Sequence, residues 1–225
     1  MHSSGWQSSI GKKALMALSG LILLGFVIGH LLGNLLVFAG PEALNGYAHK
    51  LRQLGPWLWV ARGGLLVTLI VHVWSAIALA KENRAARPVG YRAYRALETT
   101  WTARTMGWSG ALLLVYLIYH LLQFTFRVTN PELSGATDAS GSHDVYRMVV
   151  LSFQRPLISL VYVLGMTLLW AHLHHGIASA FQSLGLNTER TIPRWERVGR
   201  VVSMAIFLGY VAIPLAIVTG IIQVR

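Results

Sequence analysis

The residues best able to do chemistry in this sequence are histidines that lie inside long apolar runs. Six of the nine histidines do so: His30, His72, His120, His172, His174 and His175. An ionisable side chain at membrane depth is costly and usually faces a site. One such histidine could simply bond across a helix interface, but here four consecutive runs each supply at least one. We therefore interpret them as ligands.

The depth of these histidines predicts how they pair. Counting helical rise from the nearest charged boundary, His30 and His120 lie about 24–27 Å from the inner boundary, and His72 lies about 14 Å from it. His172 also falls in the inner half. The sequence therefore predicts an outer pair, His30 with His120, and an inner pair, His72 with His172, separated by about 10–13 Å.

Two stacked b-type haems, each held between two imidazoles from facing helices, would need this arrangement. The chain has no cysteine, which excludes disulfides, thiolate metal sites and a covalent c-type haem. Spacing alone does not choose between His172 and His175, which roughly share a helix face, while His174 points elsewhere. One of the two could ligate iron while the other bonds a propionate or a quinone.

Five membrane-spanning helices must position these histidines. Hydrophobic residues make up 54 % of the 225 residues and charged residues only 12 %, against about 25 % charged in soluble domains. We predict an all-α, polytopic membrane protein with a single domain, 1–225, in which five helices bundle around two stacked haems. The predicted helices cover approximately 13–39, 57–81, 104–127, 156–184 and 199–223.

The charge distribution predicts the orientation of the chain. Twelve Lys and Arg flank one side of the spans and seven flank the other, which places the N-terminus in the cytoplasm and the C-terminus outside. The net charge of +11 is then topological, and we expect no nucleic acid. Residues 45–53 are expected to form a short outer interfacial helix, with Tyr47, Leu51 and Leu54 on one face, and 130–144 an exposed outer loop. No clear internal repeat is visible.

Glycines surround two of the histidines. Gly25, Gly29 and Gly33 recur at four-residue spacing around His30, and Gly165 and Gly176 flank His172. Glycine would let a flat macrocycle approach the backbone. Ordinary small-residue helix packing explains the first series equally well.

Taken together, these features resemble a known family over nearly the whole chain. The matching segments are Ser19-Gly20, His30, Gly33-Asn34, Gly40-Pro41-Glu42, Asn45-x-Tyr47-Ala48, Arg104-x-Met106, Tyr119-His120, Ser152-Phe153-Gln154-x-Pro156, His172-Leu173-x-His175-Gly176, Ser179 and Phe181-Gln182-Ser183-Leu184-Gly185. The chain resembles the cytochrome b558-type, single-chain, di-haem membrane subunit of succinate dehydrogenase and fumarate reductase.

The resemblance implies a function as well as a ligand set. It implies axial ligation by His30, His72, His120 and His172, with the first helix paired to the third and the second to the fourth. Such subunits lie in the bacterial cytoplasmic membrane and anchor a flavoprotein and an iron–sulfur subunit at its cytoplasmic face. Electrons from succinate, which binds on another subunit, would pass through the haems to a membrane quinone, here menaquinone. The chain would be the quinone-reactive subunit of that enzyme, which can form a higher oligomer.

Further contacts are predicted at both boundaries. Arg155 is a candidate partner for a propionate of the outer haem. Arg104, Ser19, Trp101 and Ser183 are candidates for the inner haem, and each could instead be an interface anchor. Tyr47, His49 and Arg52 are candidates for proton and quinone contacts. The basic loop with Tyr91, Tyr94 and Trp101 is a candidate docking surface, although positive-inside charge explains it nearly as well.

Two other functions remain open from the sequence. A cytochrome b partner of a hydrogenase or formate dehydrogenase would share the membrane histidines but bind a different soluble partner. A haem-free transporter could use them for metal or proton transfer. That class predicts carboxylates at membrane depth, and the five apolar runs contain none.

Overall fold

The computed structural model describes residues 8–86, 101–138 and 140–224, of which 101–104 are described by their backbone alone. These residues form seven α-helices. Their bounds are α1 Ser9–Asn34, α2 Pro41–Gln53, α3 Pro56–Ala85, α4 Trp101–His120, α5 Val145–Phe153, α6 Pro156–Ser183 and α7 Ile192–Val218. Three short helical segments complete them: η2 Leu35–Ala39, the π-helical turn η3 Leu121–Thr125, and η4 Pro131–Leu133.

Five of these helices are long and apolar enough to cross a membrane: α1 with η2, α3, α4 with η3, α6 and α7. The protein is therefore a multi-pass membrane protein, and the predicted number of spans is confirmed. The fifth helix begins at Ile192 rather than near 199. Its first turn contains a proline, which suits a helix start because the first amides have no helical acceptor. The charged stretch up to Arg200 then continues the helix.

Local sequence sets where the helices begin and turn. The Ser8 hydroxyl accepts a hydrogen bond from the Gly11 amide at 3.1 Å and caps α1. The corners before α2 and α3 are made by Gly40 and Gly55, whose φ angles of +97° and +53° lie in the region that favours glycine. The α2 helix confirms the predicted short helix and extends it back to Pro41.

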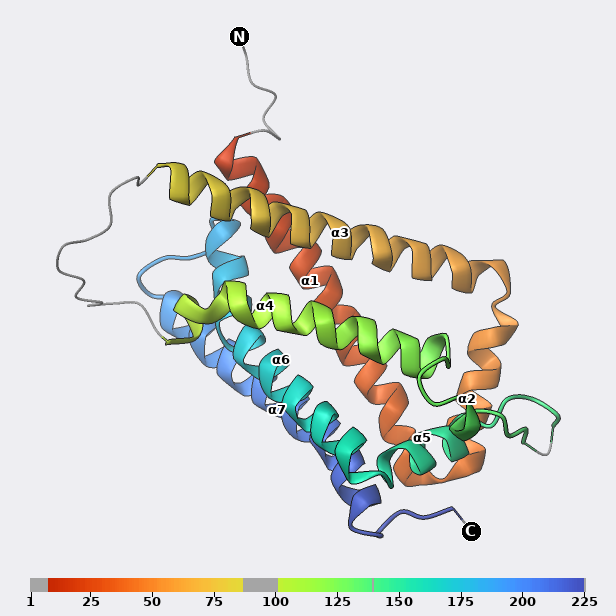
Figure 1. Ribbon diagram of the computed structural model, residues 1–225. Coiled ribbons are helices and arrows are strands. Elements are labelled where there is room, and N and C mark those ends of the chain that lie inside the picture. The colour runs from red at the N-terminus through yellow and green to blue at the C-terminus, as the bar shows by residue number, and fades with distance from the viewer. Residues whose placement is uncertain (1–7, 87–100, 139, 225) are drawn as a thin grey trace.

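The spans pack as pairs rather than as an even bundle (Figure 1). The α1 helix packs along α3, α4 packs along α6, α6 packs closely with α7, and α1 crosses α6. Within the described residues, the backbones of α1 and α4 do not pack along each other, and neither do those of α3 and α6. Only 11 % of the apolar window of α3 and 6 % of that of α4 are buried, against 39 % for α6 and for α7.

One end of the bundle, which we call the capped end, is closed by α2, η4 and α5 (Figure 1). Leu44 and Asn45 on α2 are buried there, whereas Leu54 stays half exposed. The packed core lies at this end, where Val150, Phe153 and Ile217 are almost fully buried. In the loop predicted at 130–144, the described residues are exposed or half-buried apart from the buried Ser134, and an isolated bridge joins Thr137 and His143.

Candidate functional site: two histidine pairs between helices

The structure brings the four predicted ligands together in two pairs. The ring centroid of His30 on α1 lies 5.9 Å from that of His120 on α4. The ring centroid of His72 on α3 lies 6.4 Å from that of His172 on α6. In each pair the rings come from helices whose backbones do not pack together, so side chains alone bridge the space between them.

The ring separations fit a shared metal ion. Two imidazoles that bind one ion from opposite sides, through bonds of about 2 Å, place their ring centroids roughly 6 Å apart. Such rings can rotate about the common axis, so the observed interplanar angles of 88° and 71° are both compatible with it. Two nitrogen ligands leave the other coordination positions to a cofactor, as in a bis-histidine haem.

In the inner pair, hydrogen bonds determine which ring nitrogen of His72 is free. The His72 Nδ1 lies 3.1 Å from the Met16 carbonyl oxygen, which can only accept, and 3.3 Å from the Ser19 hydroxyl. Nδ1 therefore carries the proton, and Nε2 keeps its lone pair. The structure places Ser19 beside the His72 ring, and its predicted contact with a propionate of the inner haem stays a prediction.

The His172 ring is also protonated at Nδ1, but its hydrogen-bond acceptor is a serine hydroxyl rather than a carbonyl. Its Nδ1 lies 3.2 Å from the Ser109 hydroxyl oxygen. That hydroxyl donates its single proton to the Met106 carbonyl at 3.1 Å, so its oxygen accepts from His172. Both inner imidazoles are thus held with Nε2 unprotonated, which is the state that ligates metals.

A glycine beside each serine makes room for the ring. A Cβ at Gly20 would lie 3.1 Å from the His72 Cε1, and one at Gly110 would lie 3.4 Å from the His172 Cε1. The sequence contains the same pattern twice: Ser-Gly, then nine other residues, then His. It occurs as Ser19-Gly20 with His30 and as Ser109-Gly110 with His120. Ser109 and Gly110 were not among the predicted site residues, and this short repeat is the sequence signal that identifies them.

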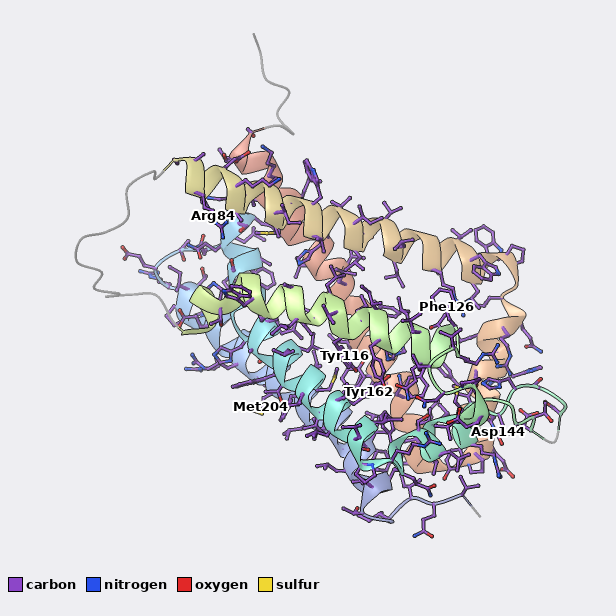
Figure 2. The ribbon with its side chains drawn as sticks, viewed as in Figure 1. Arg84, Tyr116, Phe126, Asp144, Tyr162 and Met204 are labelled. Carbon is purple, nitrogen blue, oxygen red and sulfur yellow. The ribbon has the colours of Figure 1, made fainter. Side chains whose placement is uncertain are left out.

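The outer pair has an aromatic environment. The His120 Nδ1 lies 3.2 Å from the Tyr162 hydroxyl. The His120 ring stacks on Tyr116 at 6.2 Å and touches Phe124 at 5.7 Å. Figure 2 shows Tyr116 and Tyr162 close together in the space between α4 and α6, and their ring centroids are 5.4 Å apart. Sequence reasoning missed Tyr162, whose contact depends on how α6 is rotated.

The partner ring, His30, is held from its own helix and from α7. It stacks on Phe26, one turn earlier, with ring centroids 5.3 Å apart. The Tyr210 ring lies 6.4 Å away, and its hydroxyl donates to the Val27 carbonyl at 2.8 Å. The last helix therefore helps to position a ligand carried by the first.

Buried polar groups without partners lie next to both pairs. The Ser75 hydroxyl, one turn beyond His72, is fully buried and has no hydrogen-bond partner among the described residues. The amide of Gln123, one turn beyond His120 in the π-helical turn, is 4 % exposed and is also without a partner there. Buried polar groups are normally bonded, so two such groups beside the rings fit a site built for a polar-edged cofactor.

Two of the glycines singled out from the sequence lie against tyrosine rings. A Cβ at Gly165 would lie 2.5 Å from the Tyr116 ring, and one at Gly33 would lie 2.6 Å from the Tyr47 ring. These glycines make room for aromatic side chains of the protein itself. The other members of the series, Gly25 and Gly29, have nothing within 4 Å of the position of a Cβ.

At the capped end, Arg155 is already engaged. Its guanidinium forms an ion pair with Glu132 at 2.9 Å, with both side chains about half exposed. The pKa of Glu132 is lowered by a hydrogen bond from its own backbone amide and by the charge of Arg155. Arg155 therefore has a carboxylate partner within the protein, and its contact with a propionate stays a prediction.

Of the other predicted residues, Tyr47, His49 and Arg52 lie on α2 at the capped end, and Ser183, His174 and His175 lie in the last turns of α6, towards the opposite end. Ser183 is the last residue of α6. His174 and His175 line a cavity of about 150 Å³ together with Glu196 and Arg200 of α7. The side chains of Arg104 and Trp101 and the predicted docking residues Tyr91 and Tyr94 lie outside the described residues.

Comparison of the chain with models of known protein families, with curated proteins and with solved structures finds no match.

Proposed function

We propose that this protein is a di-haem membrane cytochrome b that carries electrons between a soluble dehydrogenase and a membrane quinone. The observation that carries the proposal is the meeting of the histidine rings in two pairs, 5.9 and 6.4 Å apart, between helices whose described backbones do not pack along each other. When bound, each haem iron supplies a reversible one-electron carrier.

The chain's own residues then hold and orient that carrier. Ser19 and the Met16 carbonyl hold His72, and Ser109 holds His172, each with Nε2 free. Along α1, Ser19 beside the inner pair and His30 in the outer pair are about 16 Å apart. Two redox sites at different depths give electrons a route through the membrane, and the step is somewhat longer than the sequence estimate.

The particular complex proposed is a succinate:quinone oxidoreductase, with this chain as its membrane anchor and menaquinone as the quinone. The support is the sequence resemblance, from Ser19-Gly20 through His172-Leu173-x-His175-Gly176. A flavoprotein and an iron–sulfur subunit would dock on the cytoplasmic face, which the Lys and Arg bias assigns to the end opposite the cap. The cytochrome of a hydrogenase or formate dehydrogenase shares the histidine geometry but not this resemblance.

Haem content tests the core of the proposal. We expect a dithionite-reduced minus oxidised spectrum of the purified chain to show two b-type haems per polypeptide. One haem should be lost from His30→Ala or His120→Ala, and the other from His72→Ala or His172→Ala. His49→Ala, an exposed histidine of α2, is the control and should keep both. Absence of haem bands from protein made with ample haem would end the proposal.

Co-purification tests the particular complex. Mild detergent extraction from the native host should recover the chain with a flavoprotein that oxidises succinate. Recovery with a hydrogenase or formate dehydrogenase would keep the cytochrome and replace the partner.

A further inference from the structure

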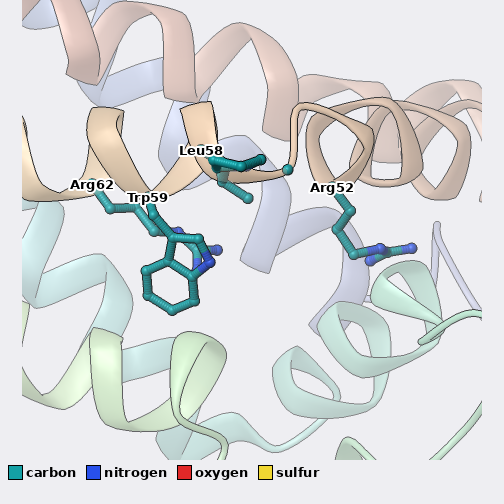
Figure 3. A pocket seen from close by; sticks show the side chains of 6 residues that line it. Arg52, Leu58, Trp59 and Arg62 are labelled. Atoms are coloured by element: carbon teal, nitrogen blue, oxygen red, sulfur yellow. The ribbon is translucent and has the colours of Figure 1, made fainter.

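At the capped end, a concave site lies in the corner between α2 and α3. It is a widely open hollow of about 620 Å³, lined by Arg52, Gly55, Pro56, Leu58, Trp59 and Arg62. Figure 3 shows the side chains of Arg52 and Arg62 extending from this corner to the side on which α4 and α5 lie, with the Trp59 ring beside Arg62. The Arg62 guanidinium lies 5.0 Å from the centre of the Trp59 ring.

The charge in this corner is not neutralised locally. Among the described residues, no Asp or Glu lines the site, and the ion pairs found are Lys12 with Glu82 and Arg155 with Glu132. Arg52 does lower the pKa of Asp138, although the Ser140 hydroxyl has the larger effect, and Asp138 does not line the site. Two guanidinium groups beside one hollow form a binding site for an anion that carries two carboxylate or phosphate groups.

The depth of Arg62 matches the outer histidine pair. Along α3, Arg62 lies about 15 Å from His72. Along α1, His30 lies about 16 Å from Ser19, the residue that contacts His72. Arg62 and His30 are therefore displaced from the inner pair by similar amounts and towards the same end. Arg62 lies in the second turn of α3 and belongs to the Lys and Arg that flank the spans at this end.

We propose that Arg62, assisted by Arg52, binds the carboxylates on the edge of the cofactor held by His30 and His120. The inference rests on the proposed function, because a b-type haem carries two propionates and each needs a counter-charge at membrane depth. Arg155, the arginine expected from the sequence, already has a carboxylate partner in Glu132. The phosphate of a membrane lipid has the same anionic chemistry, and the experiment must separate the two sources.

Redox titration of the purified haem-loaded chain tests this assignment. Arg62→Gln should lower the midpoint potential of one haem, the one that His120→Ala removes, because an unneutralised carboxylate favours ferric iron. The other haem should be unchanged. Arg62→Lys keeps the charge and should restore most of the potential, and Arg52→Gln should shift the same haem in the same direction. Arg155→Gln is the matched control at the same end and should shift neither.

Each other outcome overturns the inference in a distinguishable way. Unchanged potentials in Arg62→Gln, or equal shifts of both haems, would remove Arg62 from the outer site while leaving the cytochrome intact. If Arg62→Gln leaves both potentials unchanged but binds less anionic phospholipid, measured as phosphorus per chain, the two arginines bind a lipid headgroup. A wild-type chain without haem would overturn the proposed function and this inference together.

Discussion

The position of one proton decides what each inner histidine can do. A hydroxyl beside an imidazole can donate or accept, but the Ser109 proton is already committed to the Met106 carbonyl, so the serine oxygen must accept from His172. The carbonyl of Met16 enforces the same tautomer on His72. The ring nitrogen that remains free is the one a metal would use.

Removing the Ser109 hydroxyl should therefore weaken the inner site alone. We expect Ser109→Ala to lower the affinity of the inner haem by about 10- to 100-fold, the usual cost of losing a hydrogen-bond partner of a ligand. Haem retained after dilution in detergent measures the effect. Ser203→Ala is the control, because that fully buried hydroxyl bonds only to its own helix, at the Arg200 carbonyl. Equal retention by both variants would contradict the prediction.

For single residues, the sequence predicts how deep each histidine lies in the membrane. It does not predict which side chains of neighbouring helices contact that histidine. The histidines were found because ionisable residues stand out in apolar runs and helical rise is constant. Tyr162 and Ser109 were missed because their contacts depend on helix rotation, which a mostly apolar sequence does not specify. The Arg155 prediction did not anticipate Glu132, since that ion pair depends on how the preceding loop folds.

At the scale of the helices, the side-chain amide of Asn45 on α2 forms hydrogen bonds to the start of α5 at the capped end. The Asn45 side chain donates to the Asp144 carboxylate at 2.9 Å and accepts from the Tyr146 amide at 2.9 Å. Asp144 also caps α5 by accepting from the Arg147 amide. Asn45 is only 8 % exposed, so these groups have little access to water.

Loss of this amide should destabilise the folded protein measurably. We expect Asn45→Ala to reduce the free energy of unfolding by about 1–3 kcal/mol, because the Tyr146 amide loses its acceptor and the Asp144 carboxylate loses one of its two donors. Thermal unfolding in detergent, followed by circular dichroism, should show a lower Tm. Asn83→Ala, at an exposed position on α3, should leave the Tm unchanged. A Tm for Asn45→Ala equal to that of the wild type would show that water replaces the contact.

The helices themselves were largely predictable, because a span must satisfy its own backbone and be about 20 residues long. Their ends were less so. The α7 helix begins before the predicted start because the charged residues up to Arg200 are also helical. The predicted start was placed where the apolar run begins, which is later than the helix itself.

Viewed whole, the molecule has two helix pairs, α1 with α3 and α4 with α6, and α7 packs against the second. The Ser-Gly-His spacing recurs in the first helix of each pair, and each pair contributes one ring to each site. The orientation of this assembly in the membrane is a prediction from the Lys and Arg bias.

The absence of native cysteines makes that orientation simple to test. A single cysteine at Ser142, near the capped end, should react with a membrane-impermeant maleimide in intact cells. One at Glu189, between α6 and α7, should react only after the membrane is opened. The reverse pattern would invert the predicted orientation.

The pairing of rings from separate halves has a consequence for biosynthesis. His30 and His72 leave the ribosome with the first half of the chain, whereas His120 and His172 belong to the second. A nascent chain that ends after α3 holds half of each site and no complete one. If the sites hold haem as proposed, loading has to wait until α4 and α6 have been inserted into the bilayer. The cofactors would then join α1 to α4 and α3 to α6, in addition to the direct packing of α1 against α6, and would act as the last components of assembly.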